Sequence, residues 1–162
     1  MERILVFSDS HGSTEKMIQI IQNMPGVSAV LHLGDINRDI QELEDTFFDF
    51  PIYGVQGNND CSGLYPNEKS ITIAEKKIFI THGHYYLVNG DPAPLKTVPA
   101  AEDAHIILYG HTHIAYEERY NGKILANPGS ITKPLDGQAS YGVIEIEDGI
   151  LRYATVKLPS PF

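Results

Sequence analysis

The sequence predicts an α/β fold, and two patterns support this. In the first third of the chain, short apolar runs alternate with segments in which apolar residues recur every three to four positions. Strands that alternate with helices in this way favour a parallel sheet. In the last third, Asn121-Gly122 and Asp148-Gly149 each lie between apolar runs, which is a strong signal for a two-residue hairpin. The sheet is therefore expected to be mixed.

The first half of the chain is expected to hold three strands separated by two helices. Each strand segment is rich in β-branched or aromatic residues, and each helix has an apolar face that can pack on a sheet. The expected strands are residues 3–8, 29–33 and 51–56. The expected helix faces are Met17, Ile20, Ile21 and Met24 in the first helix and Ile40, Leu43 and Phe47 in the second.

The second half changes to hairpin patterns around one long loop. Residues 70–74 and 77–81 flank Glu75-Lys76 and predict a hairpin, and residues 105–110 predict another buried strand. Residues 82–103 are expected to form a loop with one short helix near 95–101. A length of 162 residues without an internal repeat or linker predicts a single domain over residues 1–162.

Composition and charge narrow the classes of function. With 42% hydrophobic and 20% charged residues, the chain has a globular composition, which argues against a disordered or fibrous protein. A formal charge of −9 argues against non-specific binding to nucleic acid or to an anionic membrane. The apolar runs are far shorter than the roughly 18 residues of a membrane span, and the single cysteine, Cys61, cannot form an internal disulfide. We therefore expect a cytoplasmic protein and leave a homo-oligomer open.

Polar side chains follow the ends of the expected strands. They are Asp9, His11, Asp35, Asn58, His82, His111 and His113. Taken singly, each has an ordinary explanation, such as a helix cap, a turn or a partly buried histidine. Taken together they favour a ligand site, because the loops at the carboxyl ends of strands in an open α/β sheet form one crevice.

The chemical types of these seven side chains favour metal ions as the ligand. His111 and His113 are two residues apart, and in an extended segment both rings would point to one side and converge on one object. Carboxylate, amide and imidazole donors suit manganese, iron, zinc, nickel or cobalt better than calcium. Seven ligands with one shared carboxylate suffice for two divalent ions. Such ions would also let an acidic chain attract a phosphate compound, because they reverse the local charge.

Six short motifs follow one another along the chain: SDSHG, LGD, GNND, THGH, GHTH and NPGS. In this order and at these intervals they resemble the calcineurin-like metallophosphoesterases, in particular their small single-domain prokaryotic phosphodiesterases. The resemblance spans residues 3–130. It implies a four-layer αββα sandwich of two mixed sheets, with a dinuclear metal site at the carboxyl ends of the strands.

The resemblance also implies a distribution of ligands. Asp9, His11, Asp35 and His113 would hold one ion, and Asp35, Asn58, His82 and His111 would hold the other. Asp35 would bridge two divalent ions per chain, with manganese the expected metal and iron, zinc, nickel or cobalt as alternatives.

The implied reaction is hydrolysis of a P–O bond in a small phosphoester, a diester rather than a monoester. Two ions about 3.5 to 4 Å apart can share a water, lower its pKa and clamp the phosphate oxygens, so that a bridging hydroxide attacks in line. Other nucleophiles are less convincing in this sequence. The serines of SDSHGS lack a separate triad, and Cys61 lacks an evident activating base.

One position departs from the pattern of the family. Many members have histidine directly after the asparagine ligand, where it assists the leaving group, and here that residue is Asn59. Asparagine can hydrogen-bond a phosphate oxygen but cannot donate a proton at neutral pH. We therefore expect Asn59 and His84 as catalytic residues, with His84 nearest to assist the leaving group. Asp60 is expected to orient the GNND loop.

Two other classes of protein compete with this interpretation. The same fold includes scaffold members with degraded metal sites, so a non-catalytic interaction module is the main alternative, although all seven ligand types are intact here. A metallo-β-lactamase-type hydrolase would need an Asp-His pair soon after the two histidines. Ile114-Ala115-Tyr116 follows instead, which argues against it.

Overall fold

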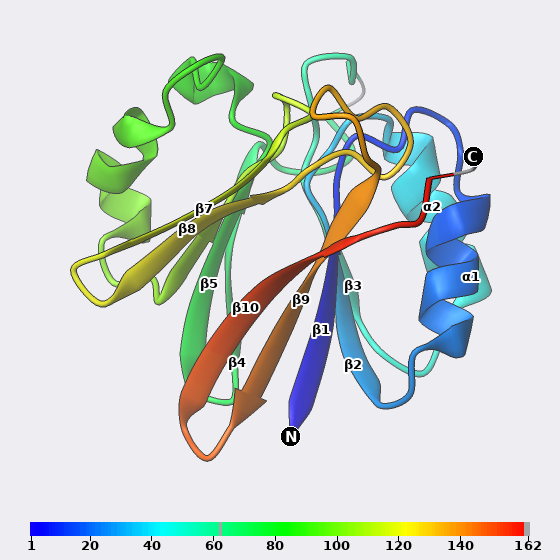
Figure 1. The fold of residues 1–162 in the computed structure, drawn as a ribbon, viewed down its shortest axis with the longest axis horizontal. Coiled ribbons are helices and arrows are strands. Elements are labelled where there is room, and N and C mark those ends of the chain that lie inside the picture. The colour runs from blue at the N-terminus through cyan, green and yellow to red at the C-terminus, as the bar shows by residue number, and fades with distance from the viewer. Residues whose placement is uncertain (62, 161–162) are drawn as a thin grey trace.

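The computed structural model describes residues 1–61 and 63–160 and shows two five-stranded sheets packed face to face (Figure 1). The strands are β1 (Glu2–Phe7), β2 (Val27–His32), β3 (Ile52–Gly54), β4 (Glu68–Ile73), β5 (Lys76–Thr81), β6 (Ile106–Leu108), β7 (Ala115–Tyr120), β8 (Lys123–Pro128), β9 (Ser140–Glu147) and β10 (Ile150–Lys157). The α-helices are α1 (Glu15–Asn23) and α2 (Asn37–Thr46), and the 3-10 helices are η1 (His84–Tyr86), η2 (Ala93–Thr97) and η3 (Pro99–Ala101).

The layers form an αββα sandwich, as the family resemblance implied. The first sheet has the order β10-β9-β1-β2-β3, and the second has the order β4-β5-β6-β8-β7. Helices α1 and α2 cover the outer face of the first sheet, and the 3-10 helices lie against the second sheet on the opposite side (Figure 1). Both sheets are mixed, because β9 and β10 in one sheet and β4 and β7 in the other are antiparallel to their neighbours.

The apolar core has one layer between the sheets and another beneath the helices. Successive side chains of a strand point to opposite faces. Accordingly, Ile4 and Val6 of β1 pack between the sheets, whereas Leu5 and Phe7 pack beneath the α-helices. A strand buried on both faces needs a continuous apolar run, which explains why β1 shows no polar alternation.

The structure confirms the expected hairpins but not the expected helix near 95–101. Asn121 and Asp148 have φ angles of 47° and 51° and precede glycines with positive φ, as two-residue hairpin turns require. The segment near 95–101 forms two 3-10 helices instead of one helix, because Val98 is extended and Pro99 cannot continue the hydrogen bonding of a helix. In the part of the chain that the structure describes, the helices are too short or too polar to cross a membrane.

The strand directions place one set of loops together. Strands β1, β2 and β3 are parallel in the first sheet, and β5, β6 and β8 are parallel in the second. Their carboxyl ends therefore open at one end of the sandwich, which is the top in Figure 1. The loops that carry the six sequence motifs begin at these strand ends.

Candidate metal centre

The structure brings the seven predicted ligands together at this end of the sandwich. Loops of the first sheet supply Asp9, His11, Asp35 and Asn58, and loops of the second sheet supply His82, His111 and His113. Asp9, Asp35 and His82 are buried, whereas the other three histidines are half-buried and Asn58 is exposed. The carboxylates thus lie beneath a rim of imidazoles that solvent and a substrate can reach.

One half of the site is centred on His113. The Nδ1 atom of His113 donates a hydrogen bond to the Lys133 carbonyl over 2.8 Å, which leaves the lone pair of the neutral ring on Nε2. Nε2 lies 3.4 Å from Asp9 Oδ1 and 3.2 Å from His11 Nε2. Among the described residues, Asp9 Oδ1 is buried without a hydrogen-bond partner. A cation at this point would satisfy all three atoms.

The other half is centred on Asn58. His82 donates from Nδ1 to the Leu33 carbonyl over 2.6 Å, so the lone pair of Nε2 faces Asn58 Oδ1 at 3.1 Å. The His111 ring lies between two amide oxygens, with Nε2 2.8 Å from Asn89 Oδ1 and Nδ1 3.1 Å from Asn58 Oδ1. A neutral ring that donates from Nε2 to Asn89 has its Nδ1 lone pair directed at Asn58 Oδ1. His82 Nε2 and Asn58 Oδ1 are thus two acceptor atoms that face each other and repel, and a bound cation removes this repulsion.

The two carboxylates lie between these halves. Asp35 Oδ2 is 3.8 Å from His11 Nε2, and Asp35 Oδ1 is 4.0 Å from His82 Nε2. Asp9 Oδ1 lies 3.9 Å from the same His82 atom. Within the described part of the chain, two groups of side chains are compact enough to hold an ion, namely Asp9, His11 and His113 in one and Asp9, Asp35 and His82 in the other. Asp9 therefore reaches both halves, whereas the sequence interpretation shared only Asp35.

The expectation that His111 and His113 converge on one object is wrong. It assumed an extended segment, but the two residues have φ angles of 69° and 59°, in the left-handed region. The chain turns between them, so His111 faces Asn58 and His113 faces Asp9. Asp9 and His11 also have left-handed φ angles, of 55° and 47°. Each such residue costs about 1–3 kcal/mol and is typical of functional sites.

Two motif glycines allow the loops to approach this closely. A Cβ atom at Gly57 would lie 2.3 Å from Asp35 Oδ1, and one at Gly110 would lie 2.0 Å from Ser8 Oγ. Any side chain at these positions would displace the groups that surround the carboxylates. The glycines in GNND and GHTH are thus explained by close packing against Asp35 and Ser8.

Burial and proximity shift the pKa values of the clustered groups in opposite directions. Burial alone would raise the pKa of the Asp9 carboxyl, but the neighbouring rings of His113 and His82 lower it overall. The neighbouring Asp9 carboxylate raises the pKa of His113. Burial and the neighbouring His82 lower the pKa of His111. The Asp9 carboxyl is thus held in its ionised form.

The expected role of Asp60 is confirmed. Its carboxylate accepts hydrogen bonds from the backbone nitrogen atoms of Gly57 at 2.8 Å, Asn37 at 2.8 Å and Ile36 at 3.1 Å. These contacts tie the GNND loop after β3 to the loop after β2, which carries Asp35.

The two residues expected to take part in catalysis lie beside the predicted ligands. The backbone nitrogen of Asn59 donates to Asp35 Oδ1 over 3.0 Å, and its side-chain amide donates to Asp35 Oδ2. The His84 ring lies 5.4 Å from the His82 ring and 6.2 Å from the His111 ring, between centroids. Burial and the neighbouring His82 lower the pKa of His84.

Several contacts at the site were missed in the sequence. Ser8 Oγ donates to Asp9 Oδ2 over 2.7 Å, and Thr132 Oγ1 donates to the Ser10 carbonyl over 2.9 Å. Asn89 contacts His111 from the long loop. Ser130 of the NPGS motif, which donates to the Asp9 carbonyl over 2.9 Å, had a sequence signal. Ser8 also lies in a motif, SDSHG, whereas Thr132 and Asn89 stand outside any spacing pattern that connects them to the ligands.

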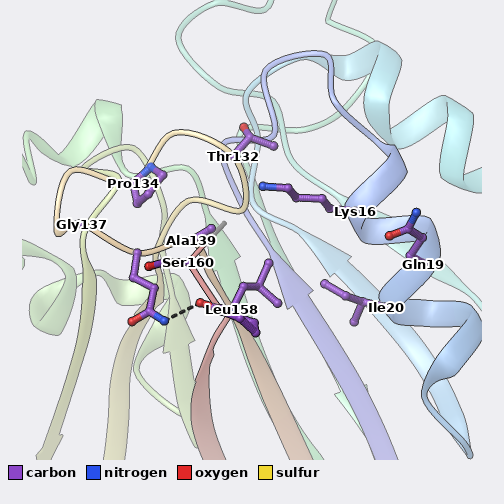
Figure 2. A pocket seen from close by; sticks show the side chains of 11 residues that line it. Lys16, Gln19, Ile20, Thr132, Pro134, Gly137, Ala139, Leu158 and Ser160 are labelled. Carbon is purple, nitrogen blue, oxygen red and sulfur yellow. Dashed lines mark hydrogen bonds between the residues drawn. The ribbon is translucent and has the colours of Figure 1, made fainter. Parts of the chain in front are cut away.

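A groove with a volume of about 580 Å³ lies beside this site, between α1 and the loop around residues 132–139 (Figure 2). Ile20, Pro134 and Leu158 make part of its lining apolar, and Lys16 and Thr132 lie near its upper rim (Figure 2). Its described lining residues include none of the seven predicted ligands. The groove therefore flanks the polar cluster and is not itself the metal centre.

Comparison with known proteins agrees with this geometry. The family model of the calcineurin-like phosphoesterase superfamily domain matches residues 2–149. A probable metallophosphoesterase of Bacillus subtilis (strain 168), YsnB, is 34% identical over 150 residues, which cover 90% of this chain and 85% of that protein.

Solved structures show the same relationship. The crystal structure of a predicted phosphoesterase from Streptococcus pneumoniae TIGR4 is 30% identical with a TM-score of 0.80, and the match covers 96% of this chain and 88% of that one. The structure of an archaeal phosphodiesterase is 26% identical with a TM-score of 0.74, over 95% of this chain and 99% of that one. The chain belongs to the calcineurin-like phosphoesterase superfamily.

Proposed function

We propose that this member of the superfamily is a phosphodiesterase that depends on two divalent metal ions. One observation carries the proposal, which is that acceptor atoms of the clustered side chains are left without a donor in the described part of the chain, namely His82 Nε2 facing Asn58 Oδ1 and the buried Asp9 Oδ1. Asn58 Oδ1 lies 3.1 Å from both His82 Nε2 and His111 Nδ1, and Asp9 Oδ1 is buried without a hydrogen-bond partner among the described residues. Two cations would resolve both conflicts at once.

The ligand assignment gives Asp9 to the half around His113, because Asp9 Oδ1 lies 3.4 Å from His113 Nε2 and 3.9 Å from His82 Nε2, and it shares Asp35 between the halves. The first ion would bind Asp9, His11, Asp35 and His113, and the second would bind Asp35, Asn58, His82 and His111. The mixture of oxygen and imidazole donors fits manganese, and also iron, zinc, nickel or cobalt. When bound, two such ions lower the pKa of a water molecule and neutralise the charge that develops on the phosphoryl group.

The protein contributes orientation and charge to this reaction. The Leu33 and Lys133 carbonyls fix the tautomers of His82 and His113, so that a ring nitrogen with a lone pair faces the centre of the site. Asn59 holds both oxygens of Asp35. His84 is the additional imidazole at the half-buried rim, and we assign it to the leaving group.

A diester suits the charge of the site better than a monoester. The described contacts of the seven predicted ligands include no Lys or Arg side chain, although His113 contacts the backbone carbonyl of Lys133. A monoester carries up to two negative charges at neutral pH, so it gains more from added cationic groups than a diester with one. The archaeal structural neighbour described as a phosphodiesterase points the same way.

The test is hydrolysis of an aryl phosphodiester and the matching aryl phosphomonoester by the purified protein with manganese. We expect faster turnover of the diester, with loss of activity after chelation and in an Asp35→Ala variant. A protein that binds manganese but hydrolyses neither ester would contradict the proposed activity. It would favour a scaffold role, and preference for the monoester would contradict the substrate class.

A further inference from the structure

A buried hydrogen-bond network lies beneath the loop that carries Asp9 and His11. Ser10 Oγ lies 2.8 Å from His32 Nε2 and donates to Asp39 Oδ2 over 2.5 Å. The backbone nitrogen of Gly12 donates to the same Asp39 oxygen over 2.8 Å. His32 and Ser10 are fully buried and Asp39 is nearly so. We call these three side chains the His32–Ser10–Asp39 network, and none of them is among the seven predicted ligands.

The direction of each hydrogen bond in this network is determined by its surroundings. The backbone nitrogen of Gly34 donates to His32 Nδ1 over 3.2 Å, so that atom holds the lone pair and Nε2 holds the hydrogen. His32 then donates to Ser10, and the single hydroxyl hydrogen of Ser10 is left for Asp39. A carboxylate accepts both this hydrogen and that of Gly12, so every donor has an acceptor.

The network holds residues 9–12, a segment of the site with an unusual backbone conformation. Asp9 and His11, on either side of Ser10, both have left-handed φ angles, which side chains other than glycine adopt only where the surroundings impose them. The network holds Ser10 by its side chain and Gly12 by its backbone, so it holds the residues on both sides of His11. The Asp9 carboxylate has further hydrogen bonds of its own, from Ser8 and from the His111 backbone.

From this arrangement we infer that His32, Ser10 and Asp39 are positioning residues for His11. This inference rests on the proposed metal function, because it assigns to them the placement of one ligand. Loss of the network should weaken the ion that His11 holds and leave the ion between Asn58, His82 and His111 bound as before. Loss of a residue that orients a metal ligand typically lowers metal affinity by about 10- to 100-fold.

The experiment compares Ser10→Ala with a matched serine variant in the whole protein. Ser28 lies on the same strand as His32 and makes two backbone hydrogen bonds with Arg3, at 3.0 and 3.1 Å, away from the metal centre. Manganese binding is followed by calorimetric titration, and electron paramagnetic resonance distinguishes paired from single manganese ions. Thermal melting of the metal-free proteins reports any general loss of stability.

We expect two manganese ions in the parent protein and in Ser28→Ala. In Ser10→Ala, one ion should bind at least about tenfold more weakly while the other is unchanged, so that single manganese replaces the paired signal at limiting metal. Asp39→Asn removes the charge but keeps one acceptor, and it should weaken the same ion. It is judged by the same criteria if Ser10→Ala does not fold.

Three results have distinct meanings. Unchanged binding of both ions in Ser10→Ala or Asp39→Asn would overturn the positioning role while the proposed function stands. Equal weakening of both ions would also overturn it, because a general structural defect would explain that result. A parent protein that binds no manganese would instead overturn the proposed metal function.

Discussion

A methyl group at Gly57 tests the placement of Asp35 directly. The Cβ atom of an alanine there would lie 2.3 Å from Asp35 Oδ1, and contacts below 3.0 Å essentially do not occur. The carboxylate must therefore move by about 0.7 Å. The backbone of Gly57 does not have a positive φ angle, so alanine introduces no backbone strain of its own. The substitution acts on the buried carboxylate that the proposal shares between both ions.

The expected effect is large for one methyl group. A displacement of about 1 Å in a catalytic constellation can cost about 100-fold in rate, which equals about 2.7 kcal/mol of transition-state stabilisation. The assay is kcat/KM for an aryl phosphodiester with manganese in excess, alongside metal content. Gly90→Ala is the control, because its Cβ atom meets nothing within 4 Å and its φ angle is not positive. A Gly57→Ala enzyme with the parent's kcat/KM and two bound ions would refute the reasoning.

Three further predictions concern acid stability, the leaving group and metal binding. Burial lowers the pKa of His32 to about 4, below its ordinary 6.5, so folding favours the neutral ring. Above pH 6.5 the ring is neutral in both the folded and the unfolded protein, so it costs no stability. As the pH falls from 6.5 to 4, the unfolded protein binds a proton that the folded protein does not, and the free energy of unfolding decreases by about 3 kcal/mol. In urea unfolding of the metal-free protein, His32→Gln should lose less stability over this range than the parent, and equal losses would contradict this. His84→Gln should lower kcat about 100-fold for esters with a leaving group of high pKa and only a few-fold for aryl esters. Equal losses across graded leaving groups would remove His84 from that role. Manganese at 100 times its Kd should stabilise the parent by about 2.7 kcal/mol per ion. Thermal melting should show a much smaller rise for Asp35→Ala, and an undiminished rise would contradict its ligand role.

The fold could be predicted from the sequence because the local hydrophobic patterns agreed with the order of the motifs along the chain. Short apolar runs and helical spacing identified the strands of the first half and both α-helices, and the Asn-Gly and Asp-Gly pairs located two hairpins. Those patterns alone suggested a mixed sheet. Its division into two facing sheets was implied only by the order of the motifs, since apolar periodicity cannot tell which sheet a buried strand joins.

The predicted ligands were accessible to sequence reasoning because each follows a strand and lies in a polar motif. Their partners were less accessible. Asn89 comes from a long loop without periodicity, and the Leu33 and Lys133 groups that orient two histidines are backbone carbonyls, which every residue has. The left-handed backbone at His111 was not expected, because the apolar run before it suggested an extended segment. His32 is buried in β2, and its link to Ser10 depends on the fold rather than on any local pattern.

The most direct test of the metal centre is anomalous diffraction from crystals of the protein grown with manganese. We predict two anomalous peaks about 3.5 to 4 Å apart, which is the spacing of a two-metal hydrolytic site. One peak should lie among Asp9, His11, Asp35 and His113, and the other among Asp35, Asn58, His82 and His111. A single peak, or two peaks away from these side chains, would contradict the proposed centre.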